Sequence, residues 1–167
     1  MVGIINVQNA WKSFSRDGGR ATVALRNVTI DVPRGSVMGV IGESGSGKST
    51  LARVVLGLIK PERGTVRVLG KDLNTLPPTE ARPLREKITV VFQEPFESLN
   101  PRMRVLQIVE EPLLIHRWKM TQNDRRARVI RALEGVGLDE QVTEKFPSAL
   151  SGGEQQRVSI ARALITD

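Results

Sequence analysis

The sequence predicts an α/β fold in which strands come first and helices occupy most of the second half. Three observations support this class. Apolar residues alternate from Val28 to Val32, as in a half-buried strand. From Leu51 to Leu58 they recur at the spacing of a helix with one buried face. A glycine-rich loop lies between these two patterns, where a strand-to-helix connection is expected.

The strands and helices follow in order. Strands are expected at 4–7, 28–32, 37–41, 65–69 and 88–92, with a turn at 33–35. Helices are expected from 51 until about 57–61, from about 105 to Pro112, and from a Thr121 cap to Gly137; residues 72–82 read as a loop with one helical turn. We therefore divide the chain into a β-rich nucleotide-binding part (1–92), a helical insert (93–150) and a final helix that returns to the core (151–167).

Composition narrows the possible partners. The 167 residues are 40% hydrophobic and 26% charged, within the ordinary range for one globular domain. The net charge is +7, but the basic residues are dispersed, which favours a solvated surface, and no nucleic-acid partner is expected. The absence of cysteine excludes disulfides and thiolate chemistry. No apolar run approaches the ~20 residues of a membrane-spanning helix, so any membrane crossing is expected from another chain.

Residues 42–50 match the complete phosphate-binding loop pattern G-x-x-x-x-G-K-S. Glycines let consecutive N–H groups converge on phosphate oxygens, and the following helix adds its positive end. Lys48 is expected to bind the β- and γ-phosphates, and Ser49 to ligate Mg²⁺. The nucleotide-binding set is Gly42, Glu43, Ser44, Gly45, Ser46, Gly47, Lys48, Ser49 and Thr50.

A second motif opens the last helix. Ser151 and Glu154 form a capping box, which alone would mark only a well-capped helix. Gly152 and Gly153 inside the box are unfavourable in a first helical turn, unless another group must approach the backbone closely. A second phosphate at the bare helix start would be such a group.

The stretch 150–157, Leu-Ser-Gly-Gly-Glu-Gln-Gln-Arg, resembles the signature segment of ATP-binding cassette (ABC) proteins. The stretch 91–103 is similar to the Q-loop region of the oligopeptide, dipeptide and nickel importer ATPases. One departure is Glu154, which stands where that group more often has Gln; glutamate there is more similar to the lipoprotein-release and macrolide-exporter ATPases.

The resemblance implies roles for further residues. Gln93 would sense the γ-phosphate as a hinge and help to ligate Mg²⁺, and with Lys48 it forms the expected catalytic set. Phe14 would stack on adenine, with Trp11 as the alternative, although either aromatic could simply pack in the β layer. Ser151, Gly152, Gly153 and Glu154 would contact the ATP of a facing subunit. His116 is expected to be an ordinary residue at a helix end.

The family also places two hydrolytic carboxylates (Walker B) at the end of a strand beyond the signature helix, and residues 1–167 contain no such strand. We therefore expect a fragment of a longer cassette subunit, incomplete at its C-terminus. Residues 1–167 alone should expose an unpaired apolar sheet edge, and should bind ATP without turning it over.

The function implied is the ATP-binding subunit of an ABC transporter, using ATP and Mg²⁺ to drive uptake of peptides or nickel. Its partners would be integral-membrane permease subunits, a second cassette (identical or different) and a substrate-binding protein, at the cytoplasmic face of the membrane. Two alternatives remain: a soluble non-transport ABC ATPase acting on nucleic acid or ribosomes, and a P-loop kinase, which the 150–154 motif disfavours.

Overall fold

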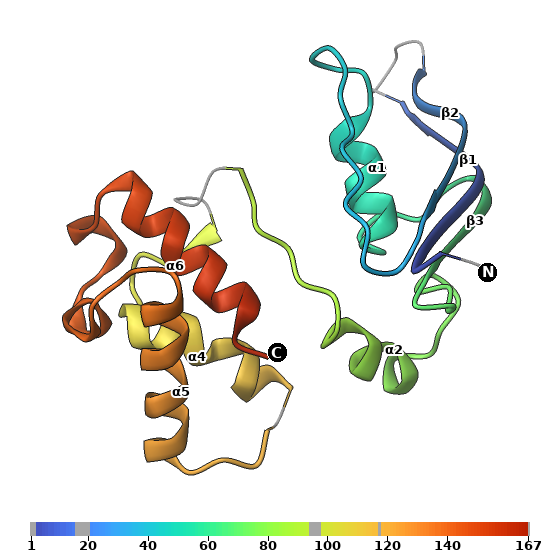
Figure 1. Ribbon diagram of the computed structural model, residues 1–167. Coiled ribbons are helices and arrows are strands. Elements are labelled where there is room, and N and C mark those ends of the chain that lie inside the picture. Colours follow the sequence, from blue (N-terminus) through green and yellow to red (C-terminus); the bar gives the residue numbers. More distant parts are fainter. Residues whose placement is uncertain (1–2, 16–20, 94–97, 117, 167) are drawn as a thin grey trace. The chain divides into compact units, whose positions relative to one another are not determined.

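The computed structural model describes residues 3–15, 21–93, 98–116 and 118–166. The chain forms two compact units, Met1–Ala81 and Arg82–Asp167, and each is described by itself. The expected division at 92/93 and 150/151 stays a prediction. Figure 1 follows the chain through both units.

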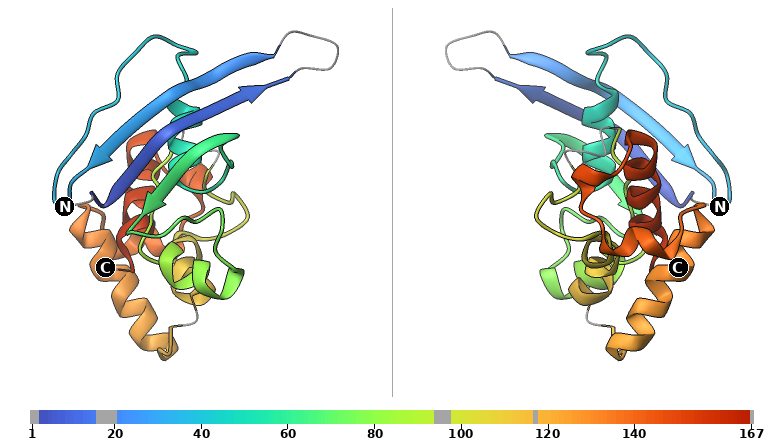
Figure 2. Two further views of the ribbon diagram at one scale, coloured as in Figure 1. Left: turned by 90° about the vertical axis from the view of Figure 1, so that its right-hand side faces the viewer. Right: turned by 90° about the vertical axis from the view of Figure 1, so that its left-hand side faces the viewer.

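Unit 1 is built on a three-stranded antiparallel sheet in the order β2-β1-β3. β1 spans Ile5–Phe14, β2 Thr22–Val32 and β3 Arg63–Val68, so the strands expected at 4–7, 28–32 and 65–69 are confirmed. β1 and β2 run side by side as a long ribbon, which Figure 2 shows from two sides. The alternating side chains of one sheet face meet helix α1 (Lys48–Val55) in a small core of Val7, Ala10, Leu25, Leu51, Val54 and Val66.

The helix after the glycine-rich loop is shorter than its apolar pattern suggested. Leu51 and Val54 are buried as predicted, but the helix ends at Val55 and Leu58 remains 60% exposed. Gly57 follows with φ +67°, a left-handed conformation that terminates helices. Further on, a loop with one helical turn was expected at 72–82. The structure instead contains the helix α2 (Pro78–Arg85).

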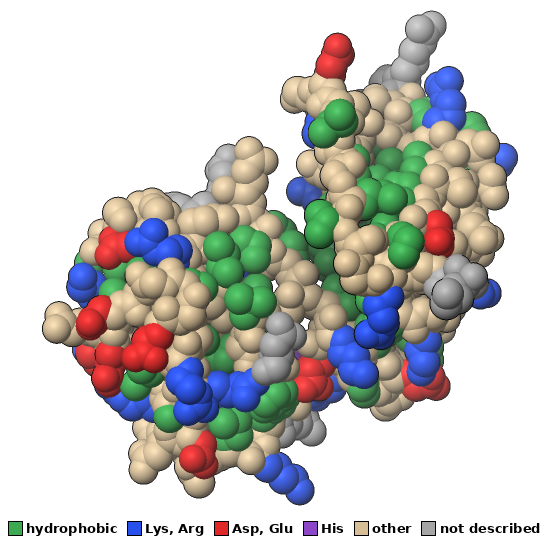
Figure 3. Space-filling model, viewed as in Figure 1, with side chains coloured by type: hydrophobic (Ala, Val, Ile, Leu, Met, Phe, Trp, Pro, Cys, Tyr) green, Lys and Arg blue, Asp and Glu red, His purple; other side chains and the backbone are tan. Residues whose placement is uncertain are grey.

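Two expected strands are absent from the structure. Residues 37–41 and 88–92 have no regular secondary structure, and Val37 is fully exposed while Ile41 is 95% exposed. Apolar runs of this kind form parallel strands only when neighbouring strands satisfy their backbone groups on both sides. Within the described residues the sheet contains only β1, β2 and β3, so these segments have no such neighbours. Figure 3 shows hydrophobic side chains reaching the surface of both units.

Unit 2 is helical. Its core lies among α4 (Val105–Ile115), α5 (Gln122–Gly135) and α6 (Gly152–Leu164), with Leu113, Val129, Leu133 and Val158 fully buried. The short 3₁₀ helices η1 (Glu140–Glu144) and η2 (Pro147–Ala149) connect α5 to α6. Thr121 caps α5 as predicted, since its side chain accepts a hydrogen bond from the Asp124 N–H.

The helix expected to end near Pro112 extends slightly beyond this residue. The helix continues through this proline to Ile115, although a proline cannot donate the hydrogen bond of an interior helical residue. The completely buried Leu113 explains the continuation, because ending the helix earlier would remove this side chain from the core. His116 then caps the helix end, as expected, and its N–H donates to the Pro112 carbonyl at 2.9 Å. Within the described residues, no helix is long and apolar enough to cross a bilayer.

Candidate nucleotide-binding site

The phosphate-binding loop lies between the exposed segment 37–41 and the first turn of α1. Gly47 is the N-cap of α1, with φ +98°, and no side chain of the described residues caps this helix. A Cβ built on Gly47 would lie 2.2 Å from the Ala24 carbonyl oxygen of β2, so only glycine fits here. The glycine therefore places the bare helix start directly against the sheet, leaving N–H groups available to an anion.

Lys48 folds back over the loop that precedes it. Its Nζ donates to the carbonyl oxygens of Gly42 and Glu43, both at 2.7 Å. The Ser46 N–H also donates to the Glu43 carbonyl at 3.2 Å, which closes the loop on itself. Because an ammonium group has three N–H donors, one remains available to an anion while two stabilise the loop.

The loop fits a triphosphate by its donors and its open surface. Gly45 has φ +81°, and the space that a Cβ on this residue would occupy is open among the described residues, its chain neighbours aside. Ser49 lies in the first turn of α1. A cavity of about 480 Å³ adjoins the loop, lined by Val23, Leu25 and Val28 of β2 and by Ser46, Lys48 and Leu51. In the part of the chain that the structure describes, no group of three or more His, Asp or Glu side chains is placed to hold a metal ion.

Two further residues expected at the nucleotide, Phe14 and Gln93, are exposed. Phe14, the last residue of β1, is 42% exposed, and the Lys12 ammonium lies 5.4 Å from its ring centroid. Trp11, the alternative, is half-buried. Gln93 is exposed and follows the unpaired 88–92 segment. The roles of Phe14 in adenine stacking and of Gln93 in sensing phosphate stay predictions.

The second motif begins α6 in unit 2. The Ser151 N–H and hydroxyl donate to Glu154 Oε2 at 2.8 and 2.7 Å, and the Glu154 N–H donates to Ser151 Oγ at 3.3 Å. The predicted capping box is therefore confirmed. The hydrogen bonds from the Ser151 side chain and then its backbone lower the pKa of Glu154 below its ordinary value, so the carboxylate is ionised at neutral pH.

Sequence reasoning missed the residue that anchors this motif. Gln155 is 8% exposed, and its Nε2 donates to the carbonyl oxygens of Pro147 at 2.9 Å and Leu150 at 3.3 Å. It thereby fixes the loop that leads to Ser151. The available signal was its position, since Gln155 shares the buried face of α6 with Val158.

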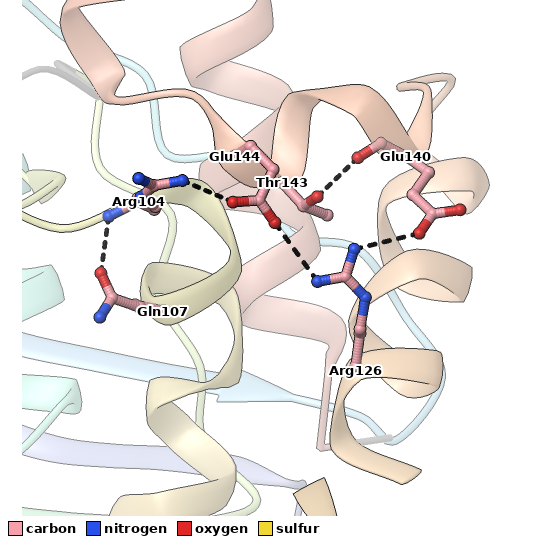
Figure 4. Close-up of polar contacts among 6 residues, drawn as sticks. All are labelled: Arg104, Gln107, Arg126, Glu140, Thr143 and Glu144. Carbon is pink, nitrogen blue, oxygen red and sulfur yellow. Dashed lines mark hydrogen bonds and ion pairs between the residues drawn. The ribbon is translucent and has the colours of Figure 1, made fainter. Parts of the chain in front are cut away.

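Among the described residues that follow Gln93, Ser98 is bonded to α6 and Arg104 to η1. Arg162 of α6 donates to the Ser98 carbonyl at 2.8 Å. Arg104, at the start of α4, forms a 2.5 Å ion pair with Glu144, and Glu144 also pairs with Arg126 at 3.3 Å. Figure 4 shows this network, in which Arg126 also contacts Glu140. Residues 94–97 of the 91–103 stretch lie outside the described residues.

The fold and these two glycine-containing helix starts define a P-loop nucleotide-binding protein of the α/β class. The family described as "ABC transporter" matches residues 25–167, and the chain belongs to this family. This confirms the resemblance inferred from the signature segment.

Similar proteins and structures agree with this assignment. The oligopeptide transport ATP-binding protein OppF of Escherichia coli (strain K12) is 44% identical over 144 residues, covering 86% of this chain and 43% of OppF. The methionine import ATP-binding protein MetN of Bifidobacterium longum (strain NCC 2705) is 42% identical, covering 98% of this chain and 40% of MetN. The chain thus spans less than half the length of these relatives.

Among solved structures, the dimeric bacterial ABC transporter cassette MJ0796 matches with a TM-score of 0.88 and 36% identity, over 97% of this chain and 69% of that one. CbiO1 of Clostridium perfringens, described as part of the complex cbiONQ, matches with a TM-score of 0.78 and 30% identity, over 99% of this chain and 62% of that one. The predicted α/β P-loop fold class is confirmed by these neighbours.

Proposed function

We propose that this chain is the ATP-binding part of a transport ATPase that drives uptake of peptides. The observation that carries the proposal is the loop at 42–48, in which a capless helix start and the Lys48 ammonium converge. These groups would bind the β- and γ-phosphates of ATP. When Mg²⁺ is bound, it would neutralise charge on the phosphates, with Ser49 and Gln93 as its protein ligands.

The second helix start would complete the site in an assembly of two cassettes. Ser151, Gly152 and Gly153 form the N-terminus of α6, whose positive end and whose Ser151 hydroxyl, once released from the Glu154 capping box, would suit the γ-phosphate bound by the facing copy. A dimeric neighbour bound to ADP and phosphate supports an assembly of this kind. We further propose permease subunits and a substrate-binding protein as partners, at the cytoplasmic face of a membrane.

Peptide is the proposed cargo because OppF and a putative oligopeptide transport protein of Bacillus subtilis are among the relatives. Nickel remains the alternative that the 91–103 resemblance leaves open. The two cargoes are distinguished by adding short peptides or Ni²⁺ to the assembled transporter. Peptides should stimulate ATP hydrolysis, whereas stimulation by Ni²⁺ alone would overturn the peptide assignment.

Nucleotide binding is tested by titrating residues 1–167 with fluorescent ATP and Mg²⁺. Binding should saturate, and Lys48→Ala should weaken it by about a hundredfold or more because a charge-assisted phosphate contact is lost. Lys60→Ala, which removes an exposed charge after α1, is the matched control and should leave affinity unchanged. We propose that this polypeptide does not hydrolyse ATP. Absence of saturable binding would refute the nucleotide role, and Lys48-dependent turnover would refute the proposed inactivity.

A further inference from the structure

This inference rests on the proposed function and concerns Glu154. One oxygen of its carboxylate, Oε2, accepts hydrogen bonds from both the N–H and the hydroxyl of Ser151. A carboxylate at the start of a helix uses the same favourable field that would attract a phosphate. In this state, therefore, the Ser151 hydroxyl already donates to an anion supplied by its own helix.

A phosphate that docks at Ser151 needs the same donor. A hydroxyl has a single hydrogen, so it cannot donate fully to the carboxylate and to a phosphate oxygen together. A phosphate oxygen bonded to Ser151 would also lie within about 5 Å of the carboxylate, a distance at which like charges repel strongly unless water and salt screen them. Docking thus requires the carboxylate to move away or to tolerate that repulsion.

We propose that Glu154 is an internal competitor for phosphate, so that this residue sets how tightly the start of α6 binds the nucleotide of a facing copy. It is a positioning residue, acting through the Ser151 hydroxyl. Release of Ser151 by Glu154 then accompanies closure of the two copies around ATP.

The surroundings of the helix start support this role. Apart from the chain neighbours and the backbone of α6 itself, no atom of the described residues lies within 4 Å of the place of a Cβ on Gly152, and on Gly153 the nearest is Arg157 Nη1 at 3.8 Å. Packing within this part of the chain therefore does not require either glycine. Both leave room for an incoming anion, beside a cation that would attract it.

The test variant removes the negative charge of Glu154 and retains the shape of its side chain. Glu154→Gln keeps an amide oxygen that accepts from Ser151, so the capping geometry is preserved. Glu134→Gln, at an exposed position of α5, removes the same charge elsewhere and is the matched control. Inorganic phosphate is titrated into the protein, and the amide NMR signals of Gly152 and Gly153 are followed, with thermal stability measured in parallel.

Glu154→Gln should lower the phosphate midpoint at Gly152 and Gly153 by about tenfold at low ionic strength, since one repulsive charge is lost. Glu134→Gln should behave as the wild type. Equal midpoints in all three proteins, or no response of these amides in any of them, would overturn the proposal. A purely structural cap would alter thermal stability without tightening phosphate binding.

The same NMR signals distinguish a failure of the proposed function from a failure of the role of Glu154. Mg²⁺ and ATP should shift the amide signals of Gly45 and Gly47, which report on the loop that begins α1. If those signals do not respond, the proposed function fails. If they respond and the phosphate midpoint at Gly152 is unchanged by Glu154→Gln, only the role of Glu154 fails.

Discussion

Gly47 approaches the backbone of β2 so closely that a Cβ on this residue would lie 2.2 Å from the Ala24 carbonyl oxygen. The contact joins the first turn of α1 to the sheet, and it fixes where the phosphate-binding loop lies. The same residue has φ +98°, a conformation that side chains other than that of glycine rarely adopt.

We therefore predict that Gly47→Ala lowers the free energy of unfolding by about 2 kcal/mol or more and abolishes ATP binding, because both the overlap and the backbone strain must be relieved. Urea unfolding and nucleotide titration measure the two effects. Gly135→Ala, in the last turn of α5 with open space around it in the described structure, should instead stabilise by about 0.5–1 kcal/mol. A Gly47→Ala variant as stable as the wild type would contradict this account.

Gln155 should be essential to the loop before the signature. Gln155→Leu fills a similar volume but removes the side-chain donor to the carbonyl oxygens of Pro147 and Leu150, while the Pro147 carbonyl keeps the Leu150 N–H at 3.1 Å. We predict a loss of about 1–3 kcal/mol in unfolding free energy. The control Gln156→Leu, one residue further along α6 on a less buried position, should have a smaller effect. Hydrogen exchange should show faster opening around Leu150 in the Gln155 variant, and unchanged exchange there would argue against the anchor.

Acid should lower the stability of unit 2, because protonation of Glu144 removes its ion pairs with Arg126 and Arg104. Hydrogen bonds from Arg126 and then Arg104 hold the pKa of this carboxyl below its ordinary 4.5. A depressed folded-state pKa contributes stability that is fully present above about pH 4.5, and is lost as the pH falls through the folded value. Glu144→Gln should therefore flatten the fall of the urea midpoint below about pH 5, whereas Glu134→Gln should not. The same acid slope in the Glu144 variant and the wild type would disprove the contribution.

Several features that the sequence predicted correctly depend on neighbours close in the chain. The Thr121 cap and the Ser151–Glu154 box are local hydrogen bonds whose residue types and spacing identify them. The loop at 42–48 is similarly local, because its glycines and Lys48 bond within a short stretch of chain.

The incorrect predictions arise where residues distant in the chain determine the local structure. The strands expected at 37–41 and 88–92 require partner strands that an apolar run cannot specify. Pro112 is a local signal to stop a helix, yet burial of Leu113 outweighs it. Gln155 was missed for a related reason: its acceptors are carbonyl groups, which every residue type carries.

The bond from Arg162 to the Ser98 carbonyl has a mechanical consequence. Arg162 lies near the far end of the helix that begins at the signature glycines, so a displacement of that helix along its axis is passed to the backbone at Ser98. A helix of this length behaves as a stiff rod, so little of such a displacement is lost along it. An axial movement at the N-terminus of α6 would therefore also move the Ser98 peptide group, a few residues after Gln93.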